Sequence, residues 1–292
     1  MAVRGHGRGR VAATVALGVL LAGCATSGPG QREEGAGSAA LMGSAEDPAR
    51  ALAAVRAVPA VLARAGGAWV RTAMETESGG TRLTIRGSGV YDFARPVGEL
   101  TVLAPGDVTG ALEHRPITEV FIPGALYMKN RGAGVPADKW VRLETGALGD
   151  GDLLTSGATD PLAAAELLAG AREVAYLRDE TVDGARVRHY WGTVDLKDAA
   201  RRAPARDRAV LLAAARGFSG GTVAFDASLD EQGRARVLRY RFRVRSRDGR
   251  GRALPGTVVS TVELVSFGAV RPRVRLPVPG DIYAGRVAAP QK

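Results

Sequence analysis

Apolar residues recur along this chain with two different periods, which predict an early helix followed by antiparallel strands. Over residues 47–64 they lie three or four positions apart, as on one face of a helix. Asp47 is typical of an N-cap residue and Pro48 of the first helical position, whereas Pro59 is expected to kink or divide the helix. From Trp69 onward the period changes to two, which favours β-strands.

The segments of period two predict about ten strands, most of them joined to a neighbour by a short turn. Ser78-Gly79-Gly80 and Asp183-Gly184 are typical hairpin turns, and residues 230–233 form a third. The predicted strands are 69–77, 81–93, 99–103, 117–122, 126–129, 139–143, 173–182, 187–194, 222–229, 237–247 and 257–267.

Two further helical segments interrupt the strands. One begins at Asp160-Pro161, again a cap followed by proline, and ends at Gly170. The other covers residues 196–216 and is expected to be interrupted near Pro204. Because strands with local hairpins alternate with two or three helices, the chain is predicted to be an α+β protein with an antiparallel sheet.

The first 23 residues have the layout of a bacterial export signal. Arginines at positions 4, 8 and 10 precede an apolar run at 11–21, and Leu21-Ala22-Gly23-Cys24 matches a lipobox. A helix over this run spans about 16 Å, which is shorter than a bilayer core of about 30 Å. We therefore expect cleavage between Gly23 and Cys24, followed by acylation of Cys24, the only cysteine in the chain.

This anchor predicts a simple domain plan at the extracytoplasmic face of the cell membrane. Residues 24–46 are rich in Gly, Ser and Ala, and we expect them to form a flexible tether that spans about 25–30 Å. Residues 47–285 are expected to form a single domain, followed by a tail at 286–292. With one cysteine no intramolecular disulfide is possible, so the fold depends on its apolar core.

The charge pattern adds one candidate surface. The full chain has a formal net charge of +10. Since an exported protein does not meet nucleic acid, anionic lipid head groups are the expected counter-charge. In one predicted strand arginines alternate with apolar residues, which places the arginines on one face. This face is either the solvated side of a half-buried strand or a contact for anionic lipid. The arginines are Arg239, Arg241, Arg243, Arg245 and Arg247.

No motif in the sequence indicates catalysis. Residues 217–221 match G-x-S-x-G, but a predicted helix precedes the motif and a strand follows it, the reverse of a hydrolase nucleophile elbow. His114 and His189 are isolated and lack the spacing of a metal site, and His6 lies in the signal. We expect no enzymatic activity, no cofactor and no metal. An esterase that uses Ser219 is the weaker alternative.

Taken together, several segments resemble the actinobacterial LppX/LprAFG lipoproteins, which share the half-barrel design of LolA and LolB. The likeness covers residues 47–285 and rests mainly on the order of the elements. The segments that carry it are 120–129 with Trp140, Thr159-Asp160-Pro161, 182–184 followed by 190–194, 224–240, and 258–267 followed by Leu276-Pro277. The resemblance implies a strongly curved antiparallel sheet, with helices over its concave face and an apolar space between them.

Two functions follow from this resemblance. The first is a membrane-anchored lipoprotein that binds or carries acylated lipid or glycolipid in the apolar space, with membrane lipids as its partners. The alternative is an envelope module on the same fold that has no lipid ligand and binds or regulates another protein. A hollow interior favours the first function, and a filled interior favours the second.

Overall fold

A single antiparallel sheet carries the fold, with the order β6-β5-β4-β3-β2-β1-β11-β10-β9-β8-β7. The structure is a computed structural model that describes residues 46–78, 81–103, 115–132, 134–218, 220–247, 253–268 and 273–285. The predicted signal, Cys24, the tether up to residue 45 and the tail 286–292 lie outside these ranges. The compact unit considered below is Ser44–Lys292.

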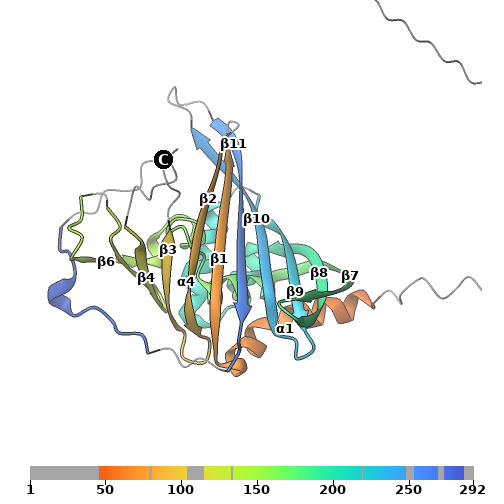
Figure 1. The fold of residues 1–292 in the computed structure, drawn as a ribbon. Helices are drawn as coiled ribbons and strands as arrows, with labels where there is room; N and C mark the ends of the chain where they lie inside the picture. Colours follow the sequence, from red (N-terminus) through yellow and green to blue (C-terminus); the bar gives the residue numbers. More distant parts are fainter. Residues whose placement is uncertain are drawn as a thin grey trace, which may run out of the picture. The chain divides into compact units, whose positions relative to one another are not determined.

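The described residues form eleven strands, close to the number predicted. The strands are β1 (Gly67–Ser78), β2 (Thr81–Asp92), β3 (Val97–Leu103), β4 (Ile117–Ile122), β5 (Ala125–Lys129), β6 (Trp140–Glu144), β7 (Ala171–Val182), β8 (Ala185–Asp195), β9 (Thr222–Asp230), β10 (Ala235–Arg247) and β11 (Ala253–Val265). Strands β6 and β7 are the two edges, so the sheet is not closed into a barrel. Figure 1 shows that the strand direction changes steadily across the sheet, as in a strongly curved half-barrel.

The described ranges contain four α-helices and three short 3₁₀ turns. The helices are α1 (Pro48–Ala65), α2 (Pro161–Leu167), α3 (Leu196–Arg202) and α4 (Ala205–Gly217), and the turns are η1 (Thr145–Ala147), η2 (Leu168–Gly170) and η3 (Pro279–Asp281). Pro204 separates α3 from α4, so the third predicted helix is two helices. Pro59, in contrast, lies inside α1 without dividing it. The predicted α+β class with an antiparallel sheet is confirmed.

Both predicted helix caps are present. The side chain of Asp47 accepts a hydrogen bond from the Ala49 backbone N–H at 2.9 Å, and that of Asp160 accepts one from the Leu162 N–H at 2.8 Å. These bonds satisfy N–H groups that the first turn of a helix leaves unpaired. Each cap therefore fixes where its helix begins.

The alternation of the strands gives the sheet an inner face and an outer face. In β10, Leu238, Tyr240 and Phe242 are buried, whereas Arg239 and its alternate neighbours are exposed. The buried strand residues join residues of all four helices in one apolar cluster, so the helices cover the inner face. Figure 1 shows α4 behind β1 and β2 in this arrangement.

One segment connects the inner face to the helix layer and is called the covering segment here. It comprises residues 145–170, which include η1, α2 and η2. The Tyr240 hydroxyl of β10 donates a hydrogen bond to the Ala164 carbonyl at 2.6 Å, and the hydroxyls of Thr159 and Ser260 hydrogen-bond at 2.6 Å. These two contacts tie the covering segment to the centre of the sheet.

Candidate functional site

The space between the inner face and the helices is filled by side chains of the protein itself. The sheet contributes large aromatic groups, and the helices contribute alanines together with valines and leucines. The small alanine side chains let helices and sheet approach closely. The buried aromatic residues include Tyr91, Phe121, Tyr190, Phe225, Tyr240 and Phe242, and the buried alanines include Ala163, Ala164, Ala165, Ala199, Ala200, Ala213 and Ala214. The apolar space that the resemblance implied is present as a packed layer.

A carboxyl group lies inside this apolar layer on β4. Glu119 is fully buried on the inner face, with Leu100 of β3 and Met128 of β5 as its cross-strand neighbours. Neither of its carboxyl oxygens has a hydrogen-bond partner. Burial raises the pKa of Glu119 well above its usual range, and the nearby charge of Asp152 raises it further. Burial therefore favours the neutral form of Glu119.

Further carboxyl groups of the covering segment and α4 surround a small enclosed cavity. The cavity has a volume of about 20 Å³ and is lined by Asp152, Asp160, Asp207 and Tyr91, among other residues. Asp152 is 2% exposed, and both of its carboxyl oxygens lack a hydrogen-bond partner. Burial raises the pKa of Asp152 well above its usual range, and the Asp150 and Asp160 charges add to this.

The same surroundings shift two acids of α2 and its cap into the neutral pH range. Burial raises the pKa of Asp160 to about 6. Burial, reinforced by the charge of Asp207, raises the pKa of Glu166 to about 7. Arg206 opposes these shifts, since its guanidinium lies 3.5 Å from a Glu166 oxygen and 3.0 Å from an Asp207 oxygen.

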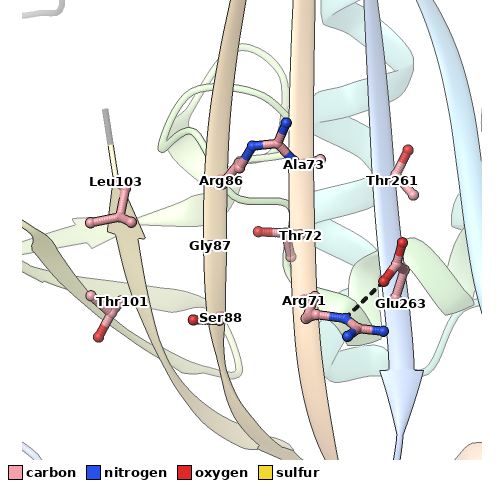
Figure 2. A pocket seen from close by; sticks show the side chains of 10 residues that line it. All are labelled: Arg71, Thr72, Ala73, Arg86, Gly87, Ser88, Thr101, Leu103, Thr261 and Glu263. Carbon is pink, nitrogen blue, oxygen red and sulfur yellow. Dashed lines mark hydrogen bonds and ion pairs between the residues drawn. The ribbon is translucent and has the colours of Figure 1, made fainter. Parts of the chain in front are cut away.

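A larger hollow lies on the outer face, over β3, β2, β1 and β11. This outer groove has a volume of about 340 Å³. Arg71 of β1 lies opposite Ser88 of β2, which lies opposite Thr101 of β3, and Ala73 of β1 lies opposite Arg86 of β2. Long and short side chains therefore alternate across the strands and leave a trough. Figure 2 shows the lining residues: Arg71, Thr72, Ala73, Arg86, Gly87, Ser88, Thr101, Leu103, Thr261 and Glu263.

Ion pairs position the arginine at one side of the outer groove. The guanidinium of Arg71 lies 2.9 Å from Glu263 of β11 and 2.5 Å from Asp183 in the β7–β8 turn. The first contact is drawn in Figure 2. All three side chains are substantially exposed, so these contacts are screened by solvent and contribute little stability.

The predicted arginine strand lies beside this groove. Arg239 donates a hydrogen bond to the Thr261 hydroxyl at 3.3 Å and has Asp226 as its cross-strand neighbour. Arg241 and Arg243 are exposed on the same face, and their cross-strand neighbours are uncharged. The predicted alternation is thus confirmed for these three arginines. The other two, Arg245 and Arg247, belong to β10, but their side chains lie outside the described part.

Two candidates from the sequence remain, Ser219 and His189. Ser219 lies outside the described residues, and α4 ends before it and β9 begins after it, the order predicted from sequence. The His189 Nε2 atom is 3.1 Å from an oxygen of Asp226, and the Nδ1 atom is 3.5 Å from one of Glu180. Within the described ranges, no group of three or more His, Cys, Asp or Glu side chains is arranged to hold a metal ion. No described helix has both the length and the hydropathy needed to cross a bilayer.

Comparison with known proteins finds similarity in structure only. No family model and no curated protein sequence matches the chain. LprF from Mycobacterium bovis is 12% identical, with 79% of this chain and 97% of that chain covered and a TM-score of 0.41. LppX from Mycobacterium tuberculosis is 12% identical, with 77% and 99% covered and a TM-score of 0.40. A LolA superfamily protein from Nitrosomonas europaea is 11% identical, with 75% and 95% covered and a TM-score of 0.31.

These structural neighbours are of the kind that the sequence resemblance named, namely mycobacterial lipoproteins and LolA-like proteins. At this level of identity the likeness concerns the fold. The ligand, the anchor and the partners of this chain have to be argued from its own residues.

Two features of the site were missed in the sequence, for different reasons. Glu119 lies between Ile117 and Phe121 in the predicted alternation, so a carboxylate on an apolar face was a readable signal. The outer groove, in contrast, depends on β1 pairing with β11, which is distant in the sequence. No local pattern indicates that pairing.

The raised acid pKa values predict that the fold is more stable at low pH. Glu166 binds its proton more tightly in the folded than in the unfolded chain, so its stabilising effect is full below about pH 4 and is lost as pH rises through about 7. We expect Glu166→Gln to equal wild type in unfolding free energy at about pH 4 and to exceed it by about 2–3 kcal/mol at pH 8. Urea unfolding followed by circular dichroism measures this difference.

Glu99→Gln is the matched control for this measurement, because Glu99 is exposed on the outer face of β3. Its unfolding free energy should follow wild type at both pH values. A Glu166→Gln variant that also follows wild type at both would show that this carboxyl is not held neutral by folding.

Proposed function

We propose that this protein is a lipid-anchored, non-enzymatic lipoprotein that binds or carries acylated lipid or glycolipid at the outer face of the cell membrane. The lipobox at Leu21–Cys24 supports the anchor, through which Cys24 becomes the acylated N-terminus of the mature chain. One observation carries the lipid-binding part. The apolar face of an open sheet is covered by separate helices. The apolar interface between sheet and helices, called the seam here, therefore runs through the whole domain.

This seam allows an acyl chain to enter without disrupting the sheet. The strand ladder runs from β6 to β7 without any contribution from a helix, so moving the helices breaks no strand pairing. The polar ties between covering segment and sheet include the hydrogen bonds of Tyr240 and Thr159 described above and the hydrogen bond between the Tyr91 hydroxyl of β2 and Asp160. An acyl chain in the seam replaces the lost apolar contacts and gains about 25 cal/mol for each Å² removed from water.

The outer face supports a second contact with the membrane. Arg241 and Arg243 lie beside the outer groove without charged cross-strand neighbours. Near an anionic lipid surface each such arginine contributes about 1 kcal/mol. We assign the arginine strand to this contact, with Arg239, Arg245 and Arg247 as its other members.

The packed interior favours the alternative function, an envelope module that binds another protein through its surface. In that case the outer groove, with its volume of about 340 Å³, is the recognition surface and the interior only supports the fold. The two functions differ in whether the seam opens to lipid.

The lipid-binding proposal predicts retained ligand. A Cys24→Ser chain that lacks residues 1–23, delipidated and then incubated with a lipid extract of the producing bacterium, should give a stoichiometric complex in native mass spectrometry. Full-length protein from the same cells should instead carry covalent acyl groups on Cys24. Repeated reconstitution without any stoichiometric adduct would favour the protein-binding alternative. Unmodified Cys24 in soluble material would contradict the anchor alone.

The arginine strand predicts binding to anionic vesicles. Arg241→Gln combined with Arg243→Gln should weaken co-sedimentation of the Cys24→Ser chain with phosphatidylglycerol vesicles by about thirtyfold at low salt, because about 2 kcal/mol of attraction is lost. The difference should shrink at 0.5 M salt, where charges are screened. Arg50→Gln combined with Arg64→Gln, two exposed positions on α1, is the matched control for net charge. Equal losses of vesicle binding in both double variants would show that binding depends on net charge and not on the arginine strand.

A further inference from the structure

We propose that the buried carboxyl cluster around Glu119 and Asp152 binds a primary ammonium group, and so selects acyl lipids whose head group carries one. This inference rests on the proposed lipid-binding function and names the class of lipid. Three observations support it: unpartnered carboxyl oxygens, the size of the cavity and the local charge balance.

The unpartnered carboxyl oxygens indicate a missing hydrogen-bond donor. Glu119 and Asp152 are at most 2% exposed, none of their four carboxyl oxygens has a partner at full hydrogen-bond geometry, and Ser156 is the group that interacts with Asp152. Buried acceptors without a donor are costly, and most buried polar groups in folded proteins are paired. A ligand that brings N–H donors to this place removes that cost. Glu119 projects from the sheet and Asp152 from the covering segment, so the donor would enter the seam itself.

The size of the adjacent cavity restricts the donor. Its volume of about 20 Å³ holds about one water-sized group. A primary ammonium is of that size and offers three N–H donors. A trimethylammonium or a sugar ring is far larger, and a trimethylammonium has no N–H. Asp152, Asp160 and Asp207 line this cavity, so carboxyl groups face an ammonium placed in it.

The charge balance favours a cation over a neutral or anionic group. Asp150 adds negative charge near Asp152, and Glu166 adds negative charge near Asp207. The Tyr91 hydroxyl is already hydrogen-bonded to Asp160. Arg206 is the one guanidinium described as acting on these acids, and it is engaged by Glu166 and Asp207. A phosphate or carboxylate head group would meet further negative charge here, whereas an ammonium is attracted.

Binding of an ammonium should release protons. Burial raises the pKa of Glu119, Asp152, Asp160 and Asp207 and so favours their protonated forms when the cavity is empty. A bound cation favours their ionised forms, and the affinity should therefore rise with pH between 5 and 8.

The test compares probes that share a twelve-carbon chain, each kept below its micelle concentration. Isothermal titration calorimetry of the delipidated Cys24→Ser chain lacking residues 1–23 measures dodecylammonium, dodecanol, dodecanoate and dodecyltrimethylammonium at pH 7.5. We expect dodecylammonium to bind at least tenfold more tightly than dodecanol, and the other two probes no more tightly than dodecanol. Titration in two buffers of different ionisation enthalpy should show proton release for dodecylammonium only.

Two near-isosteric variants test which carboxyl groups cause the preference for dodecylammonium. Glu119→Gln and Asp152→Asn should each bind dodecanol as wild type does and lose most of the preference for dodecylammonium. Asp152 adopts a positive φ of 63°, which Asn tolerates as Asp does, so both variants should fold and Glu119→Gln provides a reading independent of Asp152→Asn. Glu99→Gln, on the outer face, should keep the full preference.

The outcomes separate this inference from the proposed function. If dodecanol binds and the ammonium has no advantage, or if its advantage survives in Glu119→Gln and Asp152→Asn, the ammonium site is wrong and lipid binding stands. If none of the probes binds, the lipid-binding function fails, and the ammonium site fails with it.

Discussion

Burial of the inner face of an open sheet is the constraint on which the rest of this molecule depends. A closed barrel can fill its interior from its own strands, but an eleven-stranded sheet that is not closed needs another layer to cover its apolar side. Here four helices supply that layer, and alanines bring them close to aromatic residues such as Tyr240 and Phe242. Sheet and helices meet in one seam held mainly by apolar contact. Such contact is non-directional, so a guest molecule with an apolar chain can replace it.

The buried acids make this seam less stable than an apolar one of the same size. Glu119 of β4 and Asp152 of the covering segment lose hydration without gaining hydrogen bonds, which a domain built only for stability would avoid. Because both acids lie at the boundary between the sheet and the covering segment, this cost falls on that boundary. The hydrogen bonds of Tyr240, Thr159 and Tyr91 hold the covering segment on the sheet.

The two faces of the sheet divide the proposed work. The inner face and the helices provide an apolar interior, whereas the outer face provides exposed arginines and a groove whose ion pair with Asp183 connects β1 to the β7–β8 turn. The same alternation in β10 produces both faces, because Phe242 points inward and its neighbours Arg241 and Arg243 point outward. A strand with period two can thus take part in guest binding and in membrane contact at once.

Most of the secondary structure was readable from the sequence, because local signals determine it. Asp47 and Asp160 mark helix starts through their caps, Pro204 separates α3 from α4, and Asp183-Gly184 forms the β7–β8 turn. The strand order was not readable, since the pairing of β1 with β11 joins residues almost 200 positions apart, such as Trp69 and Val265. The candidate sites follow from that order. Whether the interior is hollow or filled depends on side-chain packing across the seam. The alternation of apolar and polar residues along the strands does not predict that packing.

Hydrogen exchange with and without a bound acyl chain tests most directly whether the helix layer moves on an intact sheet. With dodecanol bound to the delipidated chain, amide protection should change in the covering segment and in α4 and stay constant in the central strands β1, β10 and β11. Protection that changes throughout the sheet, or that changes nowhere while the probe is bound, would contradict a seam that opens between sheet and helices.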